Sequence, residues 1–154
     1  MPMKEKNFIT KNRKAYHDYI ITDEYEAGIA LLGTEVKSIR NGQINLKDSY
    51  AKIKNDEVFL LNCHISPYSH AGTVNHDPER ERKLLLKKRE IRKIKKYIEE
   101  RGNTLVPLRV YITSKGLVKL AMGLGKGKAQ YDKRAALAEK QSKREIDRIR
   151  KENY

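Results

Sequence analysis

The chain has 154 residues, enough for one domain with extensions, and its formal net charge of +14 favours a polyanionic partner such as nucleic acid or an anionic membrane surface. The single cysteine, Cys63, excludes an intramolecular disulfide and fits a reducing compartment. Residues 1–14 lack the apolar segment of a secretory signal, and no apolar run is long enough to span a membrane, so a cytoplasmic location is expected.

After a flexible basic arm over residues 1–14, the first half of the chain indicates short strands joined by tight turns. Its β-forming residues predict strands with one short helix between them: strands over 16–21 and 26–33, a helix over 35–40, and strands over 48–54 and 57–65. Thr34 is suited to cap the helix, and Asn55-Asp56 tolerate the left-handed conformation of a tight hairpin. A polar loop is expected over 66–78.

The second half begins with a change of periodicity. Apolar residues spaced seven, three and four apart predict helical structure over 80–101, either as one helix or as two that divide near Lys87. Strands over 104–112 and 117–124 follow, separated by a turn. The helical stripe is Leu84, Ile91, Ile94 and Ile98, and the opposite face presents Lys87, Lys88, Arg92, Lys95 and Lys96.

The positive charge is concentrated in three segments. Residues 1–14 hold five basic and one acidic side chain, residues 80–101 hold eleven and four, and residues 125–154 hold ten and five. Residues 15–79, by contrast, hold five basic and ten acidic side chains. Since the surface of an ordinary globular protein mixes both signs, this separation favours nucleic-acid binding over a set of solvated faces.

These elements predict a mainly β protein. We expect an OB-like closed antiparallel barrel of about six strands, with two or three external helices and a flexible basic C-terminal tail. The barrel is assigned to residues 15–124, with helices near 34–41 and 80–101. The tail, residues 125–154, has too few large apolar side chains to offset the entropy of ordering, so we expect it to be disordered alone and helical on its partner.

Three other classes of protein are less well supported by the residues. The glycine-rich segment 123–129 departs from the spacing of a nucleotide-binding P-loop. The middle of the chain contains five residues of types that commonly bind metals: Cys63, His64, His70, His76 and Asp77. Their spacing matches no common zinc pattern, so no metal, cofactor or catalytic residue is expected. An RNA-processing enzyme using His64 or His76, a structural ribosomal protein with basic extensions, and a membrane-surface protein stay as alternatives.

The chain contains an ordered set of motifs: Asn12-Arg-Lys-Ala-Tyr-His-Asp-Tyr19, Glu26-Ala-Gly28, Gly33-Thr-Glu-Val-Lys-Ser-Ile-Arg40, Asn75-His-Asp-Pro78, Arg82-Lys-Leu-Leu-Leu86, Gly125-Lys-Gly-Lys128 and Asp132-Lys-Arg134. This set resembles the SsrA-binding (small protein B) family of bacteria. The resemblance implies a non-enzymatic adaptor that binds the tRNA-like domain of transfer-messenger RNA. It also implies delivery of that RNA to stalled 70S ribosomes for trans-translation, which rescues the ribosome and tags the peptide. Small-subunit ribosomal RNA and the elongation factor that delivers aminoacyl-tRNA are the further partners expected.

The resemblance also assigns residues to two surfaces. Asn12, Glu26 and Lys119 match positions that engage the tRNA-like domain, and the full set expected to bind this RNA is Asn12, Arg13, Lys14, His17, Glu26, Lys37, Arg40, Arg82, Lys83 and Lys119. The ribosome-binding tail comprises Lys126, Lys128, Tyr131, Asp132, Lys133 and Arg134. Ala129 stands where the family usually has a second lysine.

Overall fold

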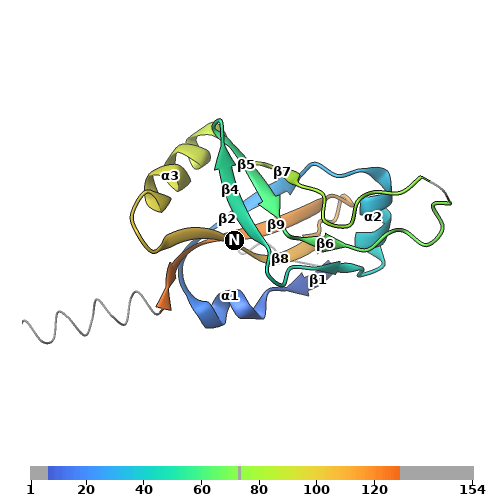
Figure 1. Cartoon of the computed structure of the whole chain (residues 1–154), viewed down its shortest axis with the longest axis horizontal. Coiled ribbons are helices and arrows are strands. Elements are labelled where there is room, and N and C mark those ends of the chain that lie inside the picture. Colours follow the sequence, from blue (N-terminus) through green and yellow to red (C-terminus); the bar gives the residue numbers. More distant parts are fainter. Residues whose placement is uncertain (1–6, 73, 129–154) are drawn as a thin grey trace, which may run out of the picture.

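A computed structural model of the chain describes residues 7–72 and 74–128 (Figure 1). Its strands are β1 (Asn7–Lys11), β2 (Tyr19–Ile29), β3 (Ile44–Asn45), β4 (Tyr50–Lys54), β5 (Glu57–Leu61), β6 (His64–Ile65), β7 (Arg82–Leu85), β8 (Asn103–Ile112) and β9 (Val118–Gly127). Its helices are α1 (Arg13–Asp18), α2 (Gly33–Arg40) and α3 (Lys88–Ile98). None of the helices in this part of the chain is long and apolar enough to cross a membrane.

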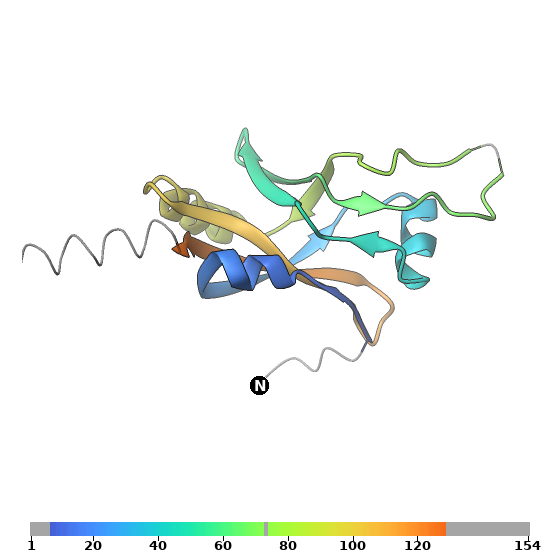
Figure 2. The ribbon, with the colours of Figure 1, turned by 60° about the horizontal axis from the view of Figure 1, so that its bottom comes forward.

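Seven strands form one large antiparallel sheet in the order β1-β8-β9-β2-β7-β5-β4, and β3 pairs with β6 in a small second sheet. The large sheet is strongly twisted, as the view in Figure 2 shows. Within the described residues its two edge strands, β1 and β4, do not pair with each other. The prediction of a mainly β protein with few helices is therefore confirmed, whereas closure of the sheet into a barrel is not.

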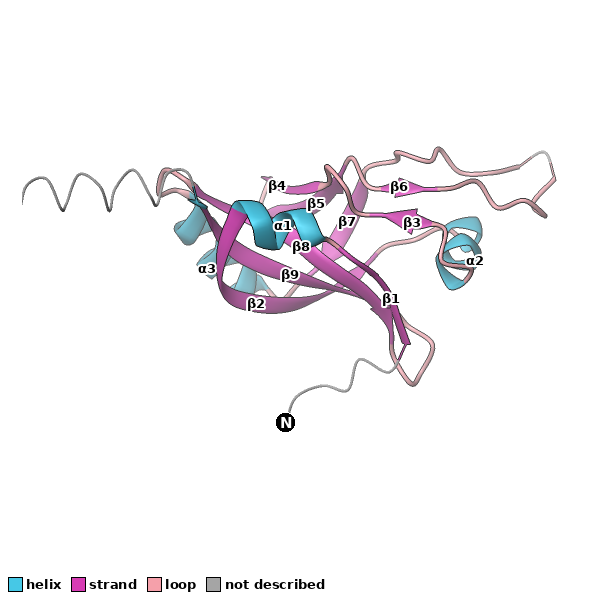
Figure 3. Ribbon diagram, turned by 90° about the horizontal axis from the view of Figure 1, so that it is seen from below, coloured by secondary structure: helices cyan, strands magenta, loops and turns pink. Residues whose placement is uncertain are grey.

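The twisted sheet supports two apolar clusters. The larger one lies inside the curl of the sheet and is sealed by α3, whose Ile94 is fully buried with residues such as Leu60, Leu120 and Met122. The smaller one lies on the other side of β8 and β9, where α1 packs Ala15 against the strands. Figure 3 shows α1 lying across β8. Among the described residues, neither cluster covers the outer face of β2, β7 and β9 near α3.

The beginning of the chain differs from the prediction. β1 pairs with β8, so residues 7–11 belong to the sheet, and residues 13–18 form α1 instead of the start of a strand. The reason is local: the Asn12 side chain accepts a hydrogen bond from the backbone N–H of Ala15 (3.3 Å) and so caps the helix. This cap overrides the β propensity of Tyr16 and its neighbours. Beyond α1, a single long strand, β2, replaces the two short strands expected.

The centre of the chain combines correct and incorrect predictions. α2 and the β4–β5 hairpin are confirmed, and both turn residues, Asn55 (φ 51°) and Asp56 (φ 61°), adopt the left-handed conformation. Residues 82–85, however, form strand β7 instead of helix, with every second side chain buried. The helix begins only at Lys88, where the Glu90 carboxylate accepts from the backbone N–H of Lys87 (2.9 Å). The division near Lys87 thus separates a strand from a helix.

The final described strand is longer than expected. β9 continues through Gly127; residues 125–127 pair with β2, and residues 125 and 126 also pair with β8. Gly125 is a close-packing position in the sheet: a Cβ there would lie 3.1 Å from the Cβ of Tyr19. Residues 125–127, which were predicted to begin the tail, therefore belong to the sheet. Residues 129–154, which carry the rest of the predicted tail, lie outside the described residues.

Candidate RNA-binding surface

Three of the predicted RNA-binding residues meet on the outer face of the sheet. In the β2–β9 ladder Gly28 is opposite Lys119 and Glu26 is opposite Ala121, while in the β2–β7 ladder Gly28 is opposite Leu85. Residues that face each other across a ladder share one face of the sheet, as do alternate residues along a strand. Glu26, Lys83 and Lys119 therefore project on the same side, where they line a groove that the beginning of α3 closes at one end.

The groove combines a carboxylate with several cations. No described group donates a hydrogen bond to Glu26 Oε2, although this atom is buried. Lys83 makes only a long ion pair with Glu57 (3.5 Å), and both side chains are about half exposed. An unpaired acceptor beside lysines suits a ligand that carries both donors and negative charge. RNA has both, because base amino groups donate and phosphates are anionic.

Leu85 completes the groove and was not predicted from the sequence. It is 53% exposed, which is unusual for a leucine in a strand, and it packs against Gly28, where an added Cβ would lie 3.2 Å from its own. The signal was present in the run Leu84-Leu85-Leu86: when one face of a strand enters the core, the middle of three leucines must point outward. Leu85 thus gives the groove an apolar platform between Lys83 and the cations of α3.

Four predicted residues surround α1, and they differ in role. Asn12 is buried, and its amide group donates to the carbonyl of Pro107 (2.9 Å) while its oxygen caps the helix, so it positions α1. Arg13 and His17 are exposed on the helix. Lys14 forms an exposed ion pair with Asp48 (3.1 Å), and this pair, which raises the pKa of Lys14 through the Asp48 hydrogen bond, borders a second groove.

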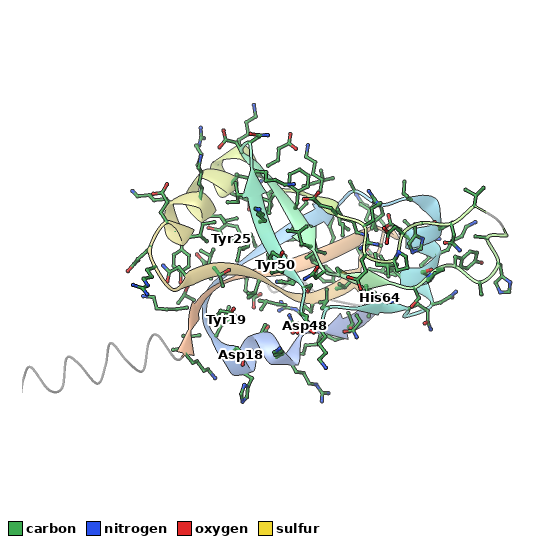
Figure 4. All side chains as sticks on the ribbon, in the orientation of Figure 1. Asp18, Tyr19, Tyr25, Asp48, Tyr50 and His64 are labelled. Carbon is green, nitrogen blue, oxygen red and sulfur yellow. The ribbon has the colours of Figure 1, made fainter. Side chains whose placement is uncertain are left out.

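The second groove lies between α1 and β4, and Figure 4 labels Asp18, Tyr19, Asp48 and Tyr50 along it. Two further predicted residues are elsewhere: Lys37 and Arg40 are exposed on α2, at the other end of the molecule from α3 (Figures 1 and 3). Lys37 lies over the ring of Tyr68, with Nζ 5.5 Å from its centroid. The predicted set is thus divided among three surfaces.

Arg82 is the one predicted contact that the structure excludes. Its side chain is 0% exposed, and its Nε donates to Glu35 Oε2 (2.5 Å). Its remaining N–H groups donate to backbone carbonyls, with Cys63 (2.7 Å) and Pro78 (3.1 Å) the shortest. The alternation of β7 turns Arg82 inward and Lys83 outward. Arg82 therefore belongs to a buried ionic network and cannot reach RNA.

Glu35 is the centre of that network. Burial would raise the pKa of its carboxyl group, but hydrogen bonds from Arg80, from the backbone N–H of Leu32 and from Arg82 outweigh burial and hold the pKa below its usual value. A lowered folded-state pKa stabilises the protein above the unfolded-state value, about 4.3, and this stabilisation is lost as the pH falls through the folded-state value.

We therefore expect the urea midpoint of unfolding to fall between pH 7 and pH 3, and to fall less in Glu35→Gln than in the wild-type chain. The variant experiences the same acid-induced repulsion among its many cations but lacks the titrating group, so the difference between the two curves isolates Glu35. Parallel curves for the two proteins would contradict this role.

Of the metal-ligand types in the central region, His76 and Cys63 are buried, whereas His64 and His70 are exposed. His76 is buried, with Nε2 2.8 Å from the carbonyl of Ile65 and Nδ1 2.9 Å from Thr34 Oγ1. Because the carbonyl only accepts, Nε2 carries a proton and donates to it. Burial raises the pKa of the Cys63 thiol to about 12. Over residues 7–72 and 74–128, no three His, Cys, Asp or Glu side chains are grouped to hold a metal ion.

The predicted tail set is only partly described. Lys126 is half-buried in β9, opposite Ile20 of β2, and Lys128 is exposed just after the strand ends. The other four residues lie outside the described residues: Tyr131, Asp132, Lys133 and Arg134.

A charged groove on the outer face of a twisted antiparallel sheet is typical of β proteins that bind nucleic acid. Comparison with known proteins is more specific. The model of the family "SmpB protein" matches residues 9–152, and the chain belongs to this family.

Its relatives carry the name SsrA-binding protein. The protein of Clostridium novyi (strain NT) is 56% identical over 149 residues, which cover 97% of this chain and 94% of the relative. That of Anoxybacillus flavithermus (strain DSM 21510 / WK1) is 54% identical over 152 residues, 99% of this chain and 98% of the relative. A chain of the solved structure "tmRNA-SmpB: a journey to the center of the bacterial ribosome" is 47% identical, with a TM-score of 0.66, and the match covers 77% of this chain and 83% of that one.

Proposed function

We propose that this protein is an RNA-binding adaptor that binds the tRNA-like domain of transfer-messenger RNA and delivers it to stalled ribosomes for trans-translation. Its membership of the SmpB family along nearly the whole chain carries the proposal. The convergence of Glu26, Lys83 and Lys119 in one groove supports it from the chain's own geometry. The protein joins two RNAs and makes no covalent bond, so it is an adaptor and not an enzyme, and it works in the cytoplasm, where ribosomes are.

The groove recognises a folded RNA by shape, phosphates and unstacked bases. Base edges are hidden in the grooves of A-form RNA, so a protein of this kind contacts loops and backbone. The carboxylate of Glu26, a residue that is partly exposed, accepts a hydrogen bond from the amino group of an exposed base. Lys83 and Lys119 neutralise phosphates on either side. The seven-stranded sheet serves as a partly open OB-like barrel that presents this face.

The other predicted residues act around the groove. Asn12 holds α1 in place so that Arg13, Lys14 and His17 face the RNA, and Lys37 and Arg40 of α2 form a further contact region. Beyond β9, the basic tail reaches the stalled ribosome and its small-subunit RNA. Tyr131 stacks on a base there, while Lys133 and Arg134 hold phosphates. Binding of the elongation factor that delivers aminoacyl-tRNA completes the assembly.

The test is a pull-down of the tagged protein from a bacterial lysate, followed by sequencing of the bound RNA. We expect one abundant tRNA-like species, together with a substoichiometric amount of ribosomes that depends on that RNA. Glu26→Ala should weaken binding to the isolated RNA about tenfold or more, because a hydrogen bond to a charged group contributes about 1.5–3 kcal/mol. The exposed Lys115 is the control, since Lys115→Ala should bind normally. Co-purification with all ribosomes in equal ratio would instead identify a structural ribosomal protein.

A further inference from the structure

Helix α3 carries a set of cations that have no ion-pair partner among the described residues. Its eleven residues include six basic side chains and one acidic one. Lys95 pairs with Asp56 of the β4–β5 turn (3.0 Å), and Glu90 is occupied at the helix start. Within residues 7–72 and 74–128, five exposed cations of the helix have neither an ion pair nor a hydrogen bond: Lys88, Arg89, Arg92, Lys93 and Lys96.

These cations are arranged in a stripe along a shallow groove. Lys88, Arg92 and Lys96 are four residues apart, so they lie on one face of the helix, and they line a groove between α3 and the β4–β5 turn. At 1.5 Å per residue the stripe is about 12 Å long. Since each strand of a nucleic-acid duplex has one phosphate per about 3.4 Å of helix axis, the stripe faces several consecutive phosphates. α3 stands at the outer edge of the molecule in Figure 1.

The stripe continues the groove that holds Glu26 and Lys119. Lys88, Ile91 and Asp56 line both grooves, so a ligand bound in one extends directly into the other. The two differ in chemistry, however. The Glu26 groove holds a carboxylate on the face of the sheet, whereas in the α3 groove four basic side chains outnumber two carboxylates, Asp56, which pairs with Lys95, and Glu99. None of the described residues that line the α3 groove is aromatic, and the nearby ring of Tyr97 is packed against the core.

We propose that the exposed face of α3 binds the phosphate backbone of a double-helical RNA stem that adjoins the element held in the Glu26 groove. Cations without aromatic partners suit a duplex, whose bases are stacked internally, while single strands are typically bound through base–aromatic stacking. The inference rests on the proposed function for the position of the RNA. It adds a sequence-independent contact that strengthens binding and makes it depend on salt.

The test compares the full-length chain with the variant Lys88→Gln/Arg92→Gln/Lys96→Gln. Two transcribed RNAs are used: a tRNA-like domain with a long duplex arm and the same domain with that arm deleted. Wild-type protein should prefer the long-armed RNA, and the variant should bind both RNAs equally. The slope of log K against log salt for the long-armed RNA should decrease by about 2–3, since each lost phosphate contact removes about one unit.

The control is Lys11→Gln/Lys47→Gln/Lys115→Gln, which changes the net charge by the same amount at exposed positions on β1, after β3 and in the β8–β9 turn. Its slope should stay close to that of the wild type. An α3 variant that retains the wild-type slope, or a control that loses as much, would overturn the proposal. Failure of the proposed function looks different: wild-type protein would then bind both tRNA-like RNAs no better than an unrelated duplex.

Discussion

Replacing Arg82 by methionine is expected to destabilise the protein by about 3–5 kcal/mol without changing its RNA surface. Arg82 and Glu35 are both fully buried, and removal of one partner of a buried pair leaves an uncompensated charge. The carbonyl group of Cys63 loses the Arg82 donor at the same time, and that of Pro78 keeps only the backbone N–H of Ile65. Since domains are stable by only about 5–15 kcal/mol, urea denaturation should show a large shift of the midpoint at constant slope.

Arg80→Met is the matched control for this experiment. Arg80 donates to the same carboxylate (2.6 Å to Oε1) but is one-third exposed, so its loss is partly compensated by water and should cost much less. The double variant Arg82→Met/Glu35→Leu should recover part of the stability, because it removes both charges. A cost for Arg82→Met no larger than that for Arg80→Met would contradict the structural role. If the folded Arg82→Met variant also lost affinity for RNA, the result would support the sequence-based prediction that Arg82 contacts RNA.

Arg82 also illustrates why part of the site was not predictable. From the sequence, Arg82 and Lys83 are equivalent members of a basic segment, and only the register of β7 shows which one points inward. The partner that neutralises Arg82 is Glu35, 47 residues earlier in the chain. A local sequence pattern cannot predict a contact between two residues that are this far apart in the chain.

Local signals were sufficient where the interaction itself is local. The Asn55-Asp56 turn and the helix α2 follow from residues next to one another, and both are confirmed. α1 was missed although its signal is also local, because a single capping side chain, Asn12, competes with a run of β-forming residues. Glu26 was assigned from the family resemblance alone. Its buried, unpaired oxygen became visible only when β9 and β7 were placed beside β2.

Deletion of residues 129–154 is expected to leave binding to the isolated tRNA-like RNA nearly unchanged while abolishing the tagging of peptides on stalled ribosomes. The structure decides where the deletion must start. The strand β9 extends through Gly127 and pairs with β2 to its end and with β8 as far as Lys126, so a chain that stops at Leu124 also loses part of the sheet. Stopping after Lys128 keeps β9 and the Glu26 groove intact. The two activities are measured by a gel-shift assay and by a reconstituted tagging assay.

The α3 variant Lys88→Gln/Arg92→Gln/Lys96→Gln is the control for this deletion, because both proteins have the same net charge. Residues 129–154 contain eight basic and five acidic side chains, so their removal lowers the net charge from +14 by three, as the triple substitution does. If charge alone governed function, the two proteins would behave alike. We expect opposite results instead: the deletion retains RNA binding and loses tagging, whereas the α3 variant weakens RNA binding and tags in proportion to the complex it forms. Equal loss of both activities in the deletion would refute a separate ribosome-binding tail.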